Sequence, residues 1–241
     1  MRYGIIHHVA GNVAALTDIE QQFSALGVRS RFCLGNVVGL YPFVDQSVDY
    51  LISHSYCVLK HVIDEAFIND GPWDGWSCTH LVEALKYTRP RTSDATIAFL
   101  RAAPTDIVSH GWRFTARFPT YGRYLRFEQE AEAAFATYSE QIIFHGSDRY
   151  LRVCFQDGRV KQLGVGKHQL DRQERQLVSP GCIGGKYWGS DPPSAVVFDE
   201  EAMTIEVLRP KLSTGAVLGS LMGSEYPKDV LRYLMENEFR C

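Results

Sequence analysis

The sequence predicts one α/β domain over residues 1–241, with two packed sheets. Three observations support this fold class. The first sixty residues alternate short apolar runs with amphipathic stretches at helical spacing, which is typical of crossover units and parallel strands. The middle of the chain is mostly helical in pattern. The last hundred residues consist of short strand-like runs separated by tight turns, and no low-complexity linker or fixed-period repeat divides the chain.

The first strand–helix unit begins with a predicted apolar strand that ends before His7. Asn12 is a plausible N-cap for the helix that follows, and Gly27 ends that helix. A second strand and helix repeat the pattern, and a third strand follows. The predicted elements are strand 3–6, helix 13–26, strand 32–34, helix 44–52 and strand 55–59.

Further along, His110-Gly111 marks the turn of a hairpin, and Asp157-Gly158 marks another. Ser93 is a plausible N-cap, and a terminal helix begins near Pro227. The predicted helices are 74–88, 93–103, 127–138 and about 227–237. The predicted strands are the hairpin 107–118, strand 141–144, the hairpin 151–155 with 159–165, and the hairpin 196–198 with 204–208.

Composition excludes several classes of protein without naming a function. Lys and Arg number 25 against 28 Asp and Glu, a formal charge of −3, which argues against nucleic acid and anionic membranes as partners. No apolar run reaches the roughly 20 residues that a membrane span needs. Two histidines interrupt the short apolar N-terminus, which does not resemble a signal peptide. The 6 cysteines form no CxxC pair, so we expect a reducing, cytoplasmic environment.

Polar residues follow each of the first three predicted strands. They are His7-His8, Asn36 and Lys60-His61. In open parallel sheets, ligand sites lie at the carboxyl ends of the strands. We therefore expect these residues to converge on one cleft.

Five segments follow one another along nearly the whole chain: HHVAGN (7–12), LGNVVGLYP (34–42), LKHV (59–62), SPGCIG (179–184) and SDPPSAV (190–196). In this order they resemble SDxHGN, LGDxVGxGP, GNHD, NPGSVG and GDPxAxY, which are motifs of the calcineurin-like metallophosphoesterases, in particular the small bacterial YfcE-type branch. The resemblance implies a four-layer αββα sandwich. It also implies two divalent metals at the strand ends, where a metal-held hydroxide attacks a phosphate.

By this resemblance, the chain is a divergent member in which most metal ligands are replaced. His8 and Ala10 stand where the family has its first Asp and His, and Asn36 stands where it has the bridging Asp. Lys60 takes the place of the Asn of GNHD, and His61 matches the His that assists catalysis as an acid.

Two further ligand motifs are also altered. The family's GHTH resembles residues 145–148, which puts Gly146 and Asp148 at its liganding histidines. For the late HG motif, a register without gaps puts Ala116 at the ligand position and His110 in the hairpin turn; the register that gives His110 this role stays open. We therefore expect no two-metal phosphoesterase and no cofactor. At best His8, Asn36 and Asp148 could hold one weak ion, short of the usual three protein ligands.

The favoured hypothesis is a cleft that binds a small anionic or phosphorylated molecule and catalyses a metal-independent reaction. Lys60 and Arg117 would supply positive charge for phosphate, sulfate or carboxylate. His8 and His61 would transfer protons, and a desolvated Lys60 with a lowered pKa would act as a base or an imine-forming amine. These three residues are the catalytic candidates. The ligand-binding candidates are His7, Asn12, Asn36, Arg117, His145, Asp148 and Cys182.

Two alternatives remain open. One is a non-catalytic pseudoenzyme that acts as a scaffold or regulatory partner of another protein, and the other is residual single-metal phosphohydrolysis. Among the candidates, His8 faces the cleft in preference to His7, because it takes the ligand position. Asp148 could instead be part of a surface ion pair, and Cys182 a buried structural thiol.

Overall fold

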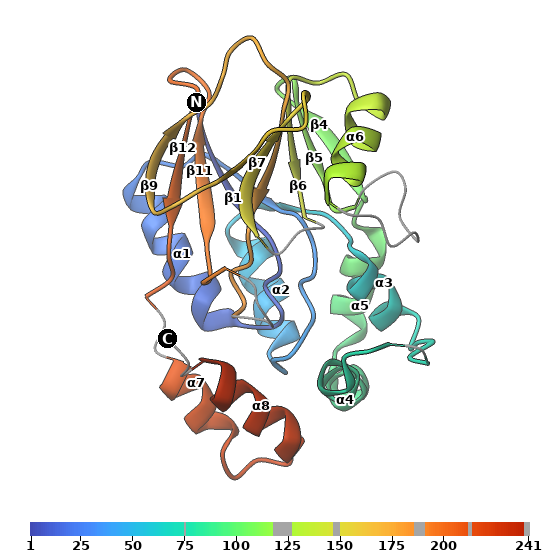
Figure 1. Cartoon of the computed structure of the whole chain (residues 1–241). Helices are drawn as coiled ribbons and strands as arrows, with labels where there is room; N and C mark the ends of the chain where they lie inside the picture. The colour runs from blue at the N-terminus through green and yellow to red at the C-terminus, as the bar shows by residue number, and fades with distance from the viewer. Residues whose placement is uncertain (75, 118–126, 147–149, 186–190, 212–213, 239–241) are drawn as a thin grey trace.

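Two six-stranded sheets face each other in the computed structural model, which describes all residues except 75, 118–126, 147–149, 186–190, 212–213 and 239–241 (Figure 1). The first sheet has the order β3-β2-β1-β11-β12-β9, and the second the order β4-β5-β6-β10-β7-β8. The strands are β1 (Arg2–Ile6), β2 (Ser30–Cys33), β3 (Tyr56–Val58), β4 (Asp106–Ser109), β5 (Trp112–Thr115), β6 (Ile142–His145), β7 (Leu151–Phe155), β8 (Val160–Gln162), β9 (Gly166–Gln169), β10 (Gln176–Pro180), β11 (Ala195–Asp199) and β12 (Thr204–Leu208).

Helices cover the outer faces of both sheets. Figure 1 shows α1 and α2 beside the first sheet, and α6 beside the second. It also shows α7 and α8 at the end of the molecule away from the N-terminus, where α8 packs on α4. The helices are α1 (Val13–Ala25), α2 (Val44–Ser53), α3 (Val62–Ile68), α4 (Thr79–Thr88), α5 (Asp94–Ala102), α6 (Phe127–Thr137), α7 (Thr214–Leu221) and α8 (Lys228–Glu238).

Three buried apolar clusters fill the spaces between the layers. One lies between the first sheet and its helices, one lies between the two sheets, and the third lies between the second sheet and α6. The period-2 pattern of β1 explains how one strand serves two of them. Tyr3 and Ile5 point into the space between the sheets, whereas Ile6 points toward the helices. This arrangement confirms the expected αββα sandwich.

The parallel pairs of strands end at one level. Ile6 of β1 pairs with Cys33 of β2, and Cys33 pairs in turn with Val58 of β3. In the second sheet, Thr115 of β5 pairs with His145 of β6. The register therefore delivers the residues that follow β1, β2, β3, β5 and β6 to a common edge of the sandwich, called the strand-end edge below.

Most of the predicted elements are confirmed, with four omissions and one shortened helix. The omitted elements are α3, α7, β9 and β10, and α4 begins at Thr79 instead of residue 74. With 7 residues, α3 is too short to show a clear helical period. β9 is an edge strand with little apolar content. β10 is buried along its whole length, so it does not alternate.

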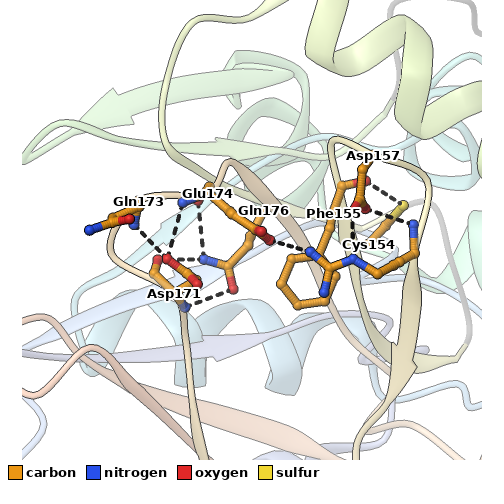
Figure 2. A network of polar contacts seen from close by, with 8 residues as sticks. Cys154, Phe155, Asp157, Asp171, Gln173, Glu174 and Gln176 are labelled. Atoms are coloured by element: carbon orange, nitrogen blue, oxygen red, sulfur yellow. Dashed lines mark hydrogen bonds and ion pairs between the residues drawn. The ribbon is translucent and has the colours of Figure 1, made fainter.

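The charged stretch 171–176 is a hydrogen-bonded turn that leads into β10 (Figure 2). Asp171 Oδ1 accepts the main-chain N–H of Gln173 at 2.6 Å and of Glu174 at 3.2 Å. The Gln176 side chain bonds back to the main chain of Asp171. The polar residues of this turn thus satisfy local main-chain groups.

The structure also bears on the expected lack of a membrane span. None of the helices in the described part of the chain has the length and apolarity to cross a bilayer.

Candidate functional site

The loops that follow β1 and β2 are bonded to each other beyond the ends of the strands. His8 N–H donates to Gly35 O at 3.0 Å, and Ala10 N–H donates to Asn36 O at 2.9 Å. The next loop continues the ladder, because Leu59 N–H donates to Cys33 O at 2.8 Å. Main-chain hydrogen bonds therefore fix the loops that carry the predicted site residues.

Three non-glycine residues in these loops have left-handed backbone conformations. They are His8 (φ 57°), Ala10 (φ 57°) and Asn36 (φ 53°). This region costs an L-residue about 1–2 kcal/mol, and it persists only where the surroundings enforce it. Such outliers gather at functional sites, which makes this edge a candidate site on backbone grounds alone.

Four polar side chains converge at the strand-end edge: His7, His8, Asn36 and His61. Asn36 Nδ2 lies 3.4 Å from His7 Nε2 and 3.5 Å from His8 Nδ1. The His7 ring centre lies 5.6 Å from that of His8 and 5.8 Å from that of His61. All four are buried, with His61 the most exposed at 8%. The predicted convergence is therefore observed for these four residues.

The Asn36 amide orients the two imidazoles that it contacts. With Nδ2 toward both rings, His7 Nε2 and His8 Nδ1 act as acceptors. The protons then lie on His7 Nδ1 and His8 Nε2. Asn36 Oδ1 is buried and has no hydrogen-bond partner in the described part of the chain, so the amide offers an acceptor to a water or a ligand.

Burial keeps two of the histidines uncharged. Burial lowers the pKa of His7 well below its ordinary value, and the neighbouring imidazoles lower it further. Burial also lowers the pKa of His145, and the positive charge of Arg152 lowers it further by a smaller amount. Near neutral pH, both side chains are hydrogen-bonding groups without a charge.

The segment that carries Cys182 lies directly against the first loop. Ile183 N–H donates to His7 O at 3.0 Å, and Gly184 N–H donates to His8 O at 2.8 Å. Cys182 itself is buried, and its carbonyl accepts Ser194 N–H. This places Cys182 beside the site, as expected, within a closely packed loop.

Asn12 lies at the site, but both ends of its amide serve the main chain. Its Oδ1 accepts Ala15 N–H at 3.2 Å, which confirms the predicted N-cap of α1. Its Nδ2 donates to Gly184 O at 3.0 Å. The structure therefore gives Asn12 a role in joining α1 to the Cys182 loop.

Lys60 differs most from expectation. Its ammonium donates to Arg101 O at 2.9 Å, in the last turn of α5, instead of pointing to His8 and His61. The last carbonyls of a helix lack intrahelical donors and carry partial negative charge, so they attract a cation. Contrary to expectation, the structure therefore does not place a desolvated Lys60 amine beside the imidazoles of His8 and His61.

The second sheet delivers Arg117 and His145 near the same edge. Arg117 forms an ion pair with Glu65 of α3 at 3.0 Å, and its side chain is 21% exposed. Gly146 N–H donates to Thr115 O. Gly146 itself packs so closely on His7 that an added Cβ would lie 2.8 Å from the ring. His145 therefore ends its strand behind the His7 imidazole, and Asp148 lies outside the described residues.

The position of His110 agrees with one of the two registers that the sequence left open. His110 occupies the turn between β4 and β5, with φ 54°, and its ring lies 5.6 Å from that of Tyr3. Ala116 directly follows β5 at the strand-end edge, where it is fully buried. His110 thus lies in the hairpin turn, where the register without gaps puts it, and at the opposite end of β5 from the strand-end edge.

Sequence reasoning missed Asp64, a fully buried carboxylate on α3. It accepts main-chain N–H groups of Asn36 (2.8 Å), Val38 (3.1 Å) and His61 (3.0 Å). Burial raises its pKa to about 6, and these hydrogen bonds hold it down against a larger rise. The signal was present in the sequence, because an acidic residue three positions after a helix N-cap often bonds the N-cap N–H.

The described residues do not fit a centre of two divalent metals. Such ions favour carboxylate and imidazole ligands, and a bridging carboxylate holds two of them together. Asn36 supplies a neutral amide, and the Asp64 carboxylate is already engaged by three N–H groups. Within the described ranges, no three His, Cys, Asp or Glu side chains come together as a set that could hold a metal ion.

Comparisons with known proteins agree with this fold. No protein-family profile matches the chain. The uncharacterized protein MJ0912 of Methanocaldococcus jannaschii is 24% identical over 224 residues, which cover 85% of each chain. A metallophosphoesterase from Sphaerobacter thermophilus superposes with a TM-score of 0.81 at 19% identity, over 98% of this chain and 99% of the other. The hypothetical protein PH1004 from Pyrococcus horikoshii OT3 gives 0.75 at 18% identity over 97% of both. The chain therefore has the fold of the calcineurin-like metallophosphoesterases.

Proposed function

We propose that the strand-end site binds a small anionic ligand with a phosphate group, and does so without a two-metal centre. The observation that carries the proposal is the convergence of His7, His8, Asn36 and His61 at the carboxyl ends of parallel strands. Binding sites of open parallel sheets lie at this position. A polar cluster whose buried Asn36 Oδ1 has no partner among the residues that the structure describes is suited to a ligand that brings both donors and acceptors.

The chemistry available at the site favours an oxyanion that carries a proton. His8 Nε2–H is a donor for a phosphate oxygen, and a P–OH group would donate to Asn36 Oδ1. Arg117 lies near the same edge, but its guanidinium is paired with Glu65, so we assign recognition of the ligand to the hydrogen-bonding groups of the cluster. Any reaction at this site would rely on His8 and His61 for proton transfer, since both imidazoles belong to the cluster.

Binding of inorganic phosphate to the purified full chain tests the proposal. We expect saturable binding, measured by thermal shift and by phosphorus NMR line width. Asn36→Ala and His8→Ala should each weaken it by about tenfold or more, because one hydrogen bond to a charged group contributes about 1.5–3 kcal/mol. The matched control is His168→Ala, a histidine on β9 whose ring bonds Gly164 O in an exposed position.

Three results would contradict the proposal. The first is phosphate binding that does not saturate in the wild type, which would favour the non-catalytic scaffold. The second is equal weakening by His168→Ala. The third is elemental analysis that finds two equivalents of manganese, iron, zinc or nickel per chain, together with metal-dependent phosphoesterase activity.

A further inference from the structure

Asp64 is a fully buried carboxylate that, within the described part of the chain, accepts hydrogen bonds from main-chain N–H groups. It lies in the first turn of α3, two positions after the start of the helix. Burial of a charge costs several kcal/mol unless hydrogen bonds compensate it. Burial of Asp64 therefore costs folding free energy, and the main-chain groups that its carboxylate contacts indicate its structural role.

The carboxylate joins two segments of the candidate site. One oxygen, Oδ2, accepts from Asn36 N–H at 2.8 Å and from His61 N–H at 3.0 Å. The other, Oδ1, accepts from Val38 N–H at 3.1 Å. Asn36 and Val38 belong to the loop after β2, and His61 immediately precedes α3. Each segment delivers one side chain of the polar cluster.

The two segments are also in direct contact beside this carboxylate. Gly35 has a φ of +87°, and a Cβ placed on it would lie 2.7 Å from His61 Cβ. Asn36, the next residue, has the left-handed φ of 53°. A strained residue of this kind needs its surroundings to hold it, and the Asp64 oxygen bonds the N–H of that residue.

We infer that Asp64 is a positioning residue that holds Asn36 and His61 in the geometry of the strand-end site. The metallophosphoesterase resemblance implies that metal ions join these two loops through side chains; here a buried carboxylate joins them through the main chain. The inference rests on the proposed function only for its effect on ligand affinity. The effect on the two side chains is independent of any ligand.

The Asp64→Asn variant separates positioning from bulk stability. An amide has the shape of a carboxylate but presents one NH₂ group, so it faces at least one of the three N–H donors with a donor. We expect the imidazole resonances of His61 and the side-chain amide of Asn36 to shift in ligand-free NMR spectra. We also expect the phosphate dissociation constant to rise about tenfold, as for the loss of one hydrogen bond to a charged group.

The matched control is Tyr56→Phe, which removes a buried hydrogen bond from Tyr56 Oη to Glu20 Oε2 (2.9 Å) away from the site. It should lower the melting temperature while leaving the His61 resonances and phosphate affinity unchanged. Unshifted His61 resonances in Asp64→Asn, or equal shifts in Tyr56→Phe, would overturn the inference. If wild-type protein binds no phosphate, the proposed function fails, and the resonances still decide the role of Asp64.

Hydrogen exchange of the wild type keeps the inference testable if Asp64→Asn does not fold. The amide hydrogens of Asn36, Val38 and His61 should exchange as slowly as those of β1, because a buried carboxylate accepts all three. Exchange of these amides at the rate of exposed loops would overturn the inference.

Discussion

Two groups of ionisable side chains, one at each end of the sandwich, differ in their burial. At the end where β1 begins, the N-terminal ammonium of Met1 pairs with Glu200 and Glu201, and Arg2 pairs with Asp199, all with partly or fully exposed side chains. At the strand-end edge, the histidines and Asp64 are buried. Burial moves the pKa values of His7 and Asp64 in the direction that disfavours their charged forms.

This difference separates ionisable groups whose pKa values depend on the surrounding fold from groups that remain largely in contact with water. Exposed ion pairs are screened by water and add little to stability. Buried polar groups are costly unless the surroundings satisfy them, so their retention calls for a structural or functional reason. This contrast supports the strand-end edge as the candidate site, although a buried charge also occurs elsewhere, in the pair of Arg31 with Glu20.

The largest expected effect is the loss of the Asp64 carboxylate. Asp64→Ala would leave three buried N–H groups without their acceptor, at about 1–3 kcal/mol each, so we expect a loss of about 4 kcal/mol or more. Asp199→Ala at the other end should cost about 1 kcal/mol, because water replaces much of what it removes. Denaturant unfolding measures the loss of unfolding free energy in each variant. Equal losses would contradict the expected difference between the two ends of the sandwich.

The second prediction uses two glycines with the same φ of +87°. An added Cβ at Gly35 would lie 2.7 Å from His61 Cβ, whereas at Gly158 it would meet nothing within 4 Å. We expect Gly158→Ala to cost about 1 kcal/mol from backbone strain alone. Gly35→Ala should cost about 3 kcal/mol, because overpacking adds to the strain. Chemical denaturation checks the pair, and a smaller loss for Gly35→Ala would refute the close packing of the site.

The third prediction concerns pH. Because burial lowers the pKa of His145 in the folded protein, the unfolded chain binds a proton there below about pH 6.5 that the folded protein does not. This contribution to stability is complete above that pH and is lost as the pH falls. His145→Gln should therefore reduce the dependence of the unfolding free energy on pH by up to about 1.4 kcal/mol per unit between pH 6.5 and 5.5.

The control for the pH experiment is His168→Gln, which replaces a half-buried histidine on β9, and the two variants are compared by the difference between their slopes. The raised pKa of Asp64 acts in the opposite sense near pH 6, and it cancels because both variants retain that residue. An unchanged slope for His145→Gln would show that this imidazole is protonated in the folded protein.

The smallest expected effect lies at the exposed end. The Glu201 side chain is 86% exposed and pairs only with the N-terminal ammonium in the described part of the chain, at 3.0 Å. We expect Glu201→Ala to leave the unfolding free energy unchanged within error, in low and in high salt. A clear, salt-sensitive loss would mean that the two ends differ less than the burial of their charges indicates.

Much of the fold could be predicted from the sequence, because α1 and the strands of the first sheet other than β9 carry strong local patterns. The missed elements were short, edge-located or buried on every side, so their patterns carried little information. Within the site, the convergence of His8, Asn36 and His61 followed from the direction of parallel strands. The long-range partners of Lys60 and Asp64 did not, since neither partner is marked by a local pattern.

The sequence by itself determined which residues stand at the carboxyl ends of the strands, because periodicity and strand direction are local properties. Tertiary structure alone decided what those residues contact. It turned Lys60 toward the carbonyl of Arg101, bonded the Asn12 side-chain NH₂ to Gly184 O, and brought Asp64 against the loop that carries Asn36. The physical reason is that buried main-chain N–H and C=O groups require partners, and those partners come from segments far apart in the sequence.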